Sequence, residues 1–160
     1  MNTEEEMKEK SMSESGLDID WYFTDASGKI AIVASAGGML PDVVVNNMEK
    51  LKGMIKYFRS LPVLSNEILI EERVVQEISG HSEEQKKAYL RDVHYMVSRG
   101  FYYFDKEVLN NYYDLRYYLK ASPIKPLIIN RDTDGHLFLP EAIINSNLSD
   151  LKAFTVDQIK

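Results

Sequence analysis

The spacing of hydrophobic residues changes twice along this chain, and that change constrains the fold more than any other feature. Between residues 41 and 97 apolar residues recur every three or four positions, as on one face of an amphipathic helix. At 18–35 and 101–121 they form short runs rich in β-branched and aromatic residues, which favour strands. The sequence therefore predicts an α+β fold, with an N-terminal β-hairpin, a helical middle and a C-terminal tyrosine-rich antiparallel β segment.

The first apolar segment predicts a β-hairpin. Residues 18–24 and 29–35 are rich in the aromatic and β-branched residues that are typical of strands. The connection at 25–28 has four residues and ends with a glycine, as a tight turn favours. A connection this short indicates two neighbouring antiparallel strands.

The middle of the chain predicts about three helices. The first covers 41–60, where a proline suits the first helical turn and apolar residues follow at steps of three and four. The second covers 66–79, although the apolar run at 68–70 leaves a short strand open as an alternative. The third begins at Ser82, and Gln85 three residues later completes a capping box.

The residues after Gly100 are rich in tyrosine and predict a second group of strands. Residues 105–121 also show helical spacing, so both strand and helix remain open there. We favour strands because of the tyrosines and because a Ser-Pro pair ends the segment. The expected elements are strands at 101–104 and 115–121, a short strand or extended edge at 126–129, and a short helix at 139–144.

Charge is unevenly distributed along the chain. Of the net charge of −6, the first 15 residues carry −3, from five glutamates and two lysines. Residues 1–16 are predicted to form a disordered acidic tail, and 17–160 a single α+β domain. The domain has no basic stripe, which argues against nucleic-acid binding. An acidic chain can still attract a basic protein partner, because opposite potentials speed encounter; the alternative is a net charge that serves solubility alone.

The sequence also predicts the cellular compartment of the protein. No segment approaches the 18 consecutive apolar residues of a membrane span, and the acidic N-terminus lacks the apolar core of a secretory signal. There is no cysteine, which suits the cytoplasm and excludes a disulfide framework, an iron–sulfur site and a thiol nucleophile. We therefore expect a cytoplasmic protein that does not associate with membranes.

Familiar catalytic and metal-binding signatures are missing from the sequence. None of the three histidines lies at metal-ligand spacing from another. The DTDG segment at 132–135 opens like a calcium loop, but its twelfth position is Ile143, where such a loop needs glutamate. The sequence therefore predicts no metal site, no cofactor and no catalysis.

One loop is a candidate ligand site. Gly37 and Gly38 lie at 36–41, between a predicted strand and a predicted helix, where backbone N–H groups can hold an anion. Asp20, on the preceding hairpin, offers a carboxylate for acid–base chemistry or for a cation. The alternative is structural: the glycines permit a sharp turn with positive φ, and Asp20 lies on a solvated strand face.

Tyrosine is unevenly distributed too, with seven of the ten between residues 95 and 118. A tyrosine ring combines a large rigid surface with a polar end, which suits an interface anchor. Tyrosine is also a good strand former, so the alternative is a half-buried sheet lined by these rings. The candidate partner-binding residues are Tyr102, Tyr103, Tyr112, Tyr113, Tyr117 and Tyr118.

Three groups of short segments carry a resemblance to a known class of proteins. They are DIDWYF at 18–23 with GKIA at 28–31, ASAGG at 34–38 and Pro41; RGFYYFD at 99–105; and YYLKA at 117–121 with Pro123, Pro126-Leu127 and Leu139-Pro140. In this order they resemble small bacterial immunity proteins that accompany polymorphic secreted toxins. The resemblance implies an α+β domain that binds and blocks a toxin without catalysis of its own. A small-molecule-binding domain or small enzyme that uses the 36–41 loop is the alternative.

Overall fold

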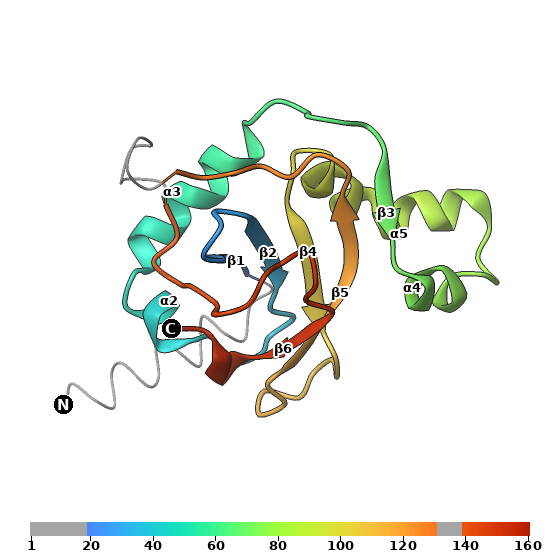
Figure 1. The fold of residues 1–160 in the computed structure, drawn as a ribbon. Helices are drawn as coiled ribbons and strands as arrows, with labels where there is room; N and C mark the ends of the chain where they lie inside the picture. Colours follow the sequence, from blue (N-terminus) through green and yellow to red (C-terminus); the bar gives the residue numbers. More distant parts are fainter. Residues whose placement is uncertain (1–18, 131–138) are drawn as a thin grey trace.

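The computed structural model describes residues 19–130 and 139–160. It is an α+β fold in which helices pack on a curled six-stranded sheet (Figure 1). The tail predicted over 1–16 and the DTDG segment lie outside the described residues. The predicted hairpin is confirmed, because β1 (Asp20–Thr24) and β2 (Ile30–Ala34) pair antiparallel across a turn in which Gly28 has φ +90°.

The sheet order is β1-β2-β4-β5-β3, and β6 also pairs with β5. The tyrosine-rich strands β4 (Tyr102–Lys106) and β5 (Arg116–Pro123) pair antiparallel as predicted, and β6 (Ala153–Thr155) adds to β5. The pairing of β2 with β4 is parallel, which the sequence did not indicate. It arises because helices α2 to α5 lie between these two strands in the chain and carry it back to the same end of the sheet.

Two of the predicted helices differ in the structure. The helix predicted over 41–60 is interrupted, giving α2 (Asp42–Val45) and α3 (Met48–Arg59). At the break the Asn47 side chain donates to the Val43 carbonyl at 2.7 Å, a local bond that competes with the helical pattern. In the first part of the segment predicted as a helix over 66–79, the alternative of a short strand is confirmed: β3 (Ile68–Ile70) pairs with β5 before α4 (Glu72–Glu77) begins.

The third helix is as predicted at its start. α5 (Glu83–Val97) begins with a capping box in which the Ser82 hydroxyl accepts from the Gln85 backbone and the Gln85 side chain accepts from the Ser82 backbone. The segment at 126–129 forms an extended edge with one isolated bridge, Lys29 to Ile128, and no strand. One further expectation is wrong. Residues 139–144 are not helical: Ile143 pairs with Thr24 along the outer edge of β1.

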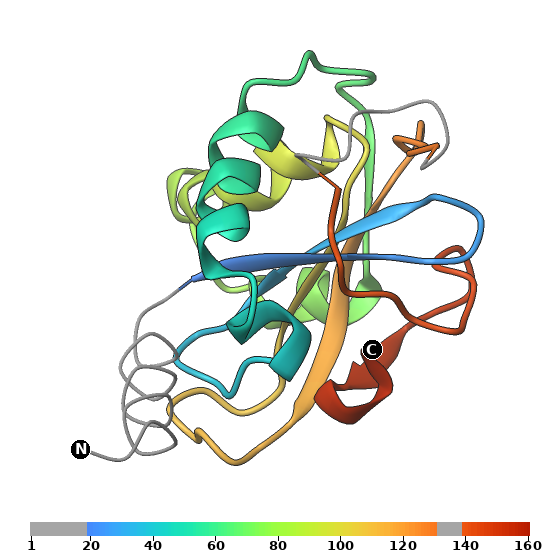
Figure 2. The ribbon, with the colours of Figure 1, turned by 90° about the vertical axis from the view of Figure 1, so that its left-hand side faces the viewer.

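The pairing of residues 142–144 with β1 explains why the helix expected at 139–144 does not form. Thr24 donates to the Ala142 carbonyl at 3.1 Å and accepts from Ile144 at 2.9 Å, so the backbone of this segment is used by the sheet edge. The short C-terminal helical turn lies instead at η2 (Val156–Gln158). Figure 2 shows the C-terminal segment, in red, running beside the blue hairpin.

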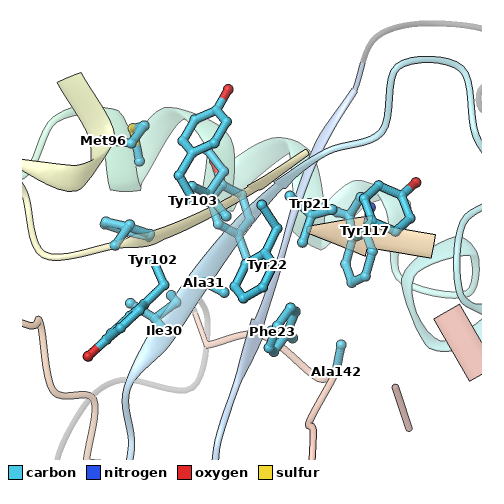
Figure 3. Packing of buried hydrophobic residues seen from close by; sticks show 14 of the residues in the cluster. Trp21, Tyr22, Phe23, Ile30, Ala31, Met96, Tyr102, Tyr103, Tyr117 and Ala142 are labelled. Carbon is cyan, nitrogen blue, oxygen red and sulfur yellow. The ribbon is translucent and has the colours of Figure 1, made fainter. Parts of the chain in front are cut away.

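The core lies on both faces of β1. Tyr22 meets Phe58 of α3 and Phe101 on the helical face, with ring centroids 4.8 and 5.9 Å away. Trp21 and Phe23 point to the other face, inside the curl of the sheet, where Phe154 contacts both (Figure 3 shows the β1 side chains). None of the helices in the described residues is long and apolar enough to cross a membrane.

Candidate functional site

Four of the six candidate tyrosines belong to the core of the sheet. Tyr102, Tyr103, Tyr117 and Tyr118 lie on β4 and β5 with at most 8% of their surface exposed. Figure 3 shows Tyr102, Tyr103 and Tyr117 among the buried side chains. The Tyr117 ring also stacks on Phe154 at 5.3 Å. Side chains buried in this way offer a partner almost no area, so their strand-forming role accounts for them.

The other two, Tyr112 and Tyr113, lie in the loop that joins β4 to β5, at the lower end of Figure 1. Tyr113 is 75% exposed and Leu109 is 61% exposed, and the half-buried Tyr112 ring meets Tyr113 edge-on at 5.1 Å. Val108 is exposed beside them. We call Val108, Leu109, Tyr112 and Tyr113 the apolar tip. A cluster of exposed apolar side chains of this kind marks an interaction surface more often than isolated ones do.

Local hydrogen bonds fix the backbone of the tip. The Asn111 side chain accepts from the Tyr113 N–H at 3.2 Å, and the Asn111 carbonyl accepts from the Asp114 N–H at 3.1 Å. Asn110 has φ +61°, a left-handed conformation that asparagine tolerates better than most residues. The Tyr112 carbonyl accepts from the Met39 N–H at 3.3 Å. These bonds hold the part of the tip that carries Tyr112 and Tyr113 without a partner.

The base of this loop is built from charged groups. The Arg116 side chain donates to both carboxylate oxygens of Asp114, at 2.7 and 3.1 Å. Glu107, at the other end of the loop, accepts from Arg73 of α4 at 2.7 and 2.9 Å. Lys106 is buried beneath the loop and donates to the Asp114 carbonyl; burial lowers the pKa of its amine, and the nearby Asp114 carboxylate opposes that shift. These contacts tie the loop to α4 and to both strands.

The Asp114 carboxyl is expected to titrate well below other aspartates. Hydrogen bonds from the Arg116 side chain and backbone lower its pKa to about 2. Because this value is below the ordinary one of about 3.9, the contact supports the loop above that pH and is lost as the pH falls towards 2. A carboxyl-carbon NMR titration measures the midpoint, and Arg116→Gln should raise it towards the ordinary value. An ordinary midpoint in the unaltered chain would contradict the contact.

The glycine pair lies next to this loop, because Met39 joins the two through its bond to Tyr112. Ala36 and Gly37 have φ of +44° and +76°, as a sharp turn requires. A Cβ at Gly38 would lie 2.8 Å from the Tyr117 hydroxyl and 3.0 Å from the Lys106 amine. The space beside Gly38 is therefore filled by side chains of the sheet.

Asp20 belongs to a separate ionic network. Its carboxylate accepts from Arg59 of α3 at 2.8 Å, and the same guanidinium donates to Asp92 of α5 at 3.0 Å. The Tyr103 hydroxyl donates to Asp92 at 3.3 Å, and burial together with the neighbouring carboxylates raises the pKa of that tyrosine. This network joins β1 and β4 to two helices. The bonds of this network link Asp20 to α3, at a distance along the chain from Gly37 and Gly38.

Sequence reasoning missed Val108, Leu109 and Lys106. The run VLNNYY, with two asparagines between apolar pairs, is a signal for an exposed turn. The part of the chain that the structure describes contains no group of three or more His, Asp or Glu side chains placed to hold a metal ion. Comparisons with family models, with curated proteins and with solved structures returned no match to this chain. The support for the candidate site therefore comes from the exposure and the hydrogen bonds of its own residues.

Proposed function

We propose that this chain is a non-catalytic protein-binding domain of the cytoplasm that neutralises a cognate toxin by occlusion. The apolar tip is the contact surface, and the observation that carries the proposal is the exposure of Tyr113 on a loop with a fixed backbone. The resemblance of the sequence to toxin immunity proteins supplies the class of partner.

A preformed apolar tip suits tight binding. Ordering a loop on association costs free energy, and a loop that is already fixed avoids most of that cost. Large rigid side chains such as tyrosine are also enriched among the few residues that dominate binding energy. The Asp114–Arg116 and Glu107–Arg73 pairs around the tip keep its flanks polar, as the rim of an interface is.

The net charge supports a basic partner. The chain carries −6, so a basic surface would be attracted over a distance comparable to the Debye length, about 8 Å at physiological salt. This steering acts mainly on the association rate, which should fall as salt is added. A toxin domain with a basic active-site surface is a partner of this kind.

Tyr113→Ala should weaken the complex by about fivefold or more, because truncating an interface anchor costs more than about 1 kcal/mol. The partner is first recovered with the tagged chain from native cell lysate that includes secreted proteins. Its affinity is then measured by calorimetry. Tyr57→Ala is the matched control, because Tyr57 is an exposed tyrosine on α3, outside the tip.

Folding of the variant is checked separately. The unfolding free energy of Tyr113→Ala should stay within about 0.5 kcal/mol of the parent, since the ring is on the surface. Equal affinity of the parent and Tyr113→Ala would overturn the placement of the site. Recovery of no partner by a folded bait would favour the alternative ligand-binding function, which a thermal-shift screen tests.

The alternative has less support from the geometry. It requires a ligand beside Gly37 and Gly38, but the Tyr117 hydroxyl and the Lys106 side chain occupy the space against Gly38. It also uses Asp20, whose carboxylate is engaged by Arg59. Neither observation favours a ligand there, so protein binding remains the function that we propose.

A further inference from the structure

The strand β3 has one paired edge and one open edge. Ile68, Leu69 and Ile70 lie opposite Pro123, Ser122 and Ala121 of β5. The next residue, Glu71, donates its N–H to the Lys120 carbonyl at 2.9 Å, so Glu71 and Lys120 form a hydrogen-bonded pair. Because such pairs alternate along an antiparallel ladder, the N–H and C=O groups of Ile68 and Ile70 point away from β5.

No other described residue bonds those outward groups. β3 pairs with β5 alone, and it lies at the margin of the sheet in front of α5 (Figure 1). Two N–H and two C=O groups are thus presented along one edge. Such an edge is a template on which a further strand can add, and several peptide-binding domains use one in this way.

The edge is held in place before any partner arrives. The side chains of Ile68 and Ile70 pack against the core, while Leu69 points outward and is 59% exposed. The segment that leads into β3 is fixed to α5, since the Ser98 carbonyl accepts from Leu64 and Ser65 at 2.8 and 3.2 Å. An added strand would therefore meet a formed surface with an apolar residue at its centre.

The flanking charges select the occupant. Glu67 and Glu71 lie two residues before and two residues after Leu69, so all three side chains share one face of the strand. Glu71 pairs with Lys152 at 2.6 Å, whereas Glu67 makes no ion pair with a described residue. A second copy added symmetrically about Leu69 would place Glu67 opposite the other copy's Glu71. Like charges directly opposite each other are destabilising, which disfavours self-pairing.

We propose that the outer edge of β3 binds an extended segment of a protein partner as an added antiparallel strand. The segment carries an apolar side chain that lies on Leu69 and, two residues away, a cation that faces Glu67; Glu71 is already paired with Lys152. The main-chain bonds to Ile68 and Ile70 supply affinity, and the alternating side chains supply specificity. This surface is distinct from the apolar tip and does not require it.

The test uses the full chain and the synthetic peptide Thr-Lys-Thr-Val-Thr-Lys-Thr, acetylated and amidated. NMR follows amide hydrogen exchange as the peptide is added. Exchange at Ile68 and Ile70 should slow at least several-fold, since both amides gain acceptors. Glu67→Lys should weaken binding by about fivefold, because it replaces a cross-strand attraction with a repulsion. Glu84→Lys, the same charge change at an exposed position of α5, should alter affinity less than about twofold.

Three results would overturn the proposal. A peptide with N-methylated backbone that binds equally well would mean that charge alone holds it. Unchanged exchange at Ile68 and Ile70 at saturating peptide would place the peptide elsewhere. Protection of these two amides that rises with protein concentration in the free chain would show that a second copy occupies the edge. None of these results depends on the partner used for Tyr113→Ala, so the proposal for the β3 edge and the proposal for the apolar tip can be refuted independently.

Discussion

Gly100→Ala should lower the free energy of unfolding by about 3 kcal/mol or more, because two penalties combine at this position. Gly100 has φ +98°, a conformation that residues with a Cβ rarely adopt. A Cβ there would also lie 2.4 Å from the Leu127 backbone nitrogen, which must move to make room. That nitrogen donates to the Gly100 carbonyl at 3.0 Å, so the strain falls on an existing bond.

Chemical denaturation with urea measures this loss, and Gly80→Ala is the matched control. Nothing lies within 4 Å of a Cβ built at Gly80. Alanine there should leave stability unchanged or raise it by about 0.5 kcal/mol, since it reduces the freedom of the unfolded chain. Equal effects of the two substitutions would mean that neither the conformation nor the packing of Gly100 is as described.

Phe154→Ala is expected to cost about 3–5 kcal/mol, the usual range for removing a buried aromatic ring. The Phe154 ring contacts four others inside the curl of the sheet, with centroids 5.0–6.1 Å away: Trp21, Phe23, Phe104 and Tyr117. These rings come from β1, β4 and β5, whereas Phe154 is on β6. The deletion leaves a cavity that this many rigid neighbours cannot close.

The effect is read from the thermal and urea midpoints, with Tyr113→Ala as a comparison that removes a ring of similar size from the surface. The first variant should lose most of its stability and the second almost none. A Phe154 variant that unfolds at the parent's midpoint would show that β6 does not close the curl of the sheet in solution.

The sequence predicts the elements formed by local contacts. The β1–β2 hairpin follows from a four-residue turn between two apolar runs, and the start of α5 follows from the Ser82–Gln85 capping box. Both depend on residues close together in the chain, so a single sequence contains the necessary information. The pairing of β4 with β5 is also local, because the two strands follow each other in the chain with one loop between them.

Long-range contacts account for most of what the sequence did not predict. Ile70 fits a helix by its spacing from Val74, so the sequence left helix and strand open at 68–70, and pairing with β5 decides for the strand. Residues 139–144 follow β1 instead of coiling, because an exposed edge is available there. The tyrosines illustrate the same limit. Tyr117 and Tyr113 are the same residue type, but Tyr117 is buried on β5 whereas Tyr113 is exposed in the loop before that strand.

The parallel pairing of β2 with β4 has a consequence for how the molecule assembles. Each of these strands already belongs to an antiparallel hairpin with its neighbour in the chain, β1 for the one and β5 for the other. The two hairpins can therefore form early and separately, since their loops are short. Joining them requires the chain to close a loop that contains every helix from α2 to α5. We therefore expect docking of the two hairpins along β2 and β4 to be the slow step of folding, after which the helices gain their complete packing surface.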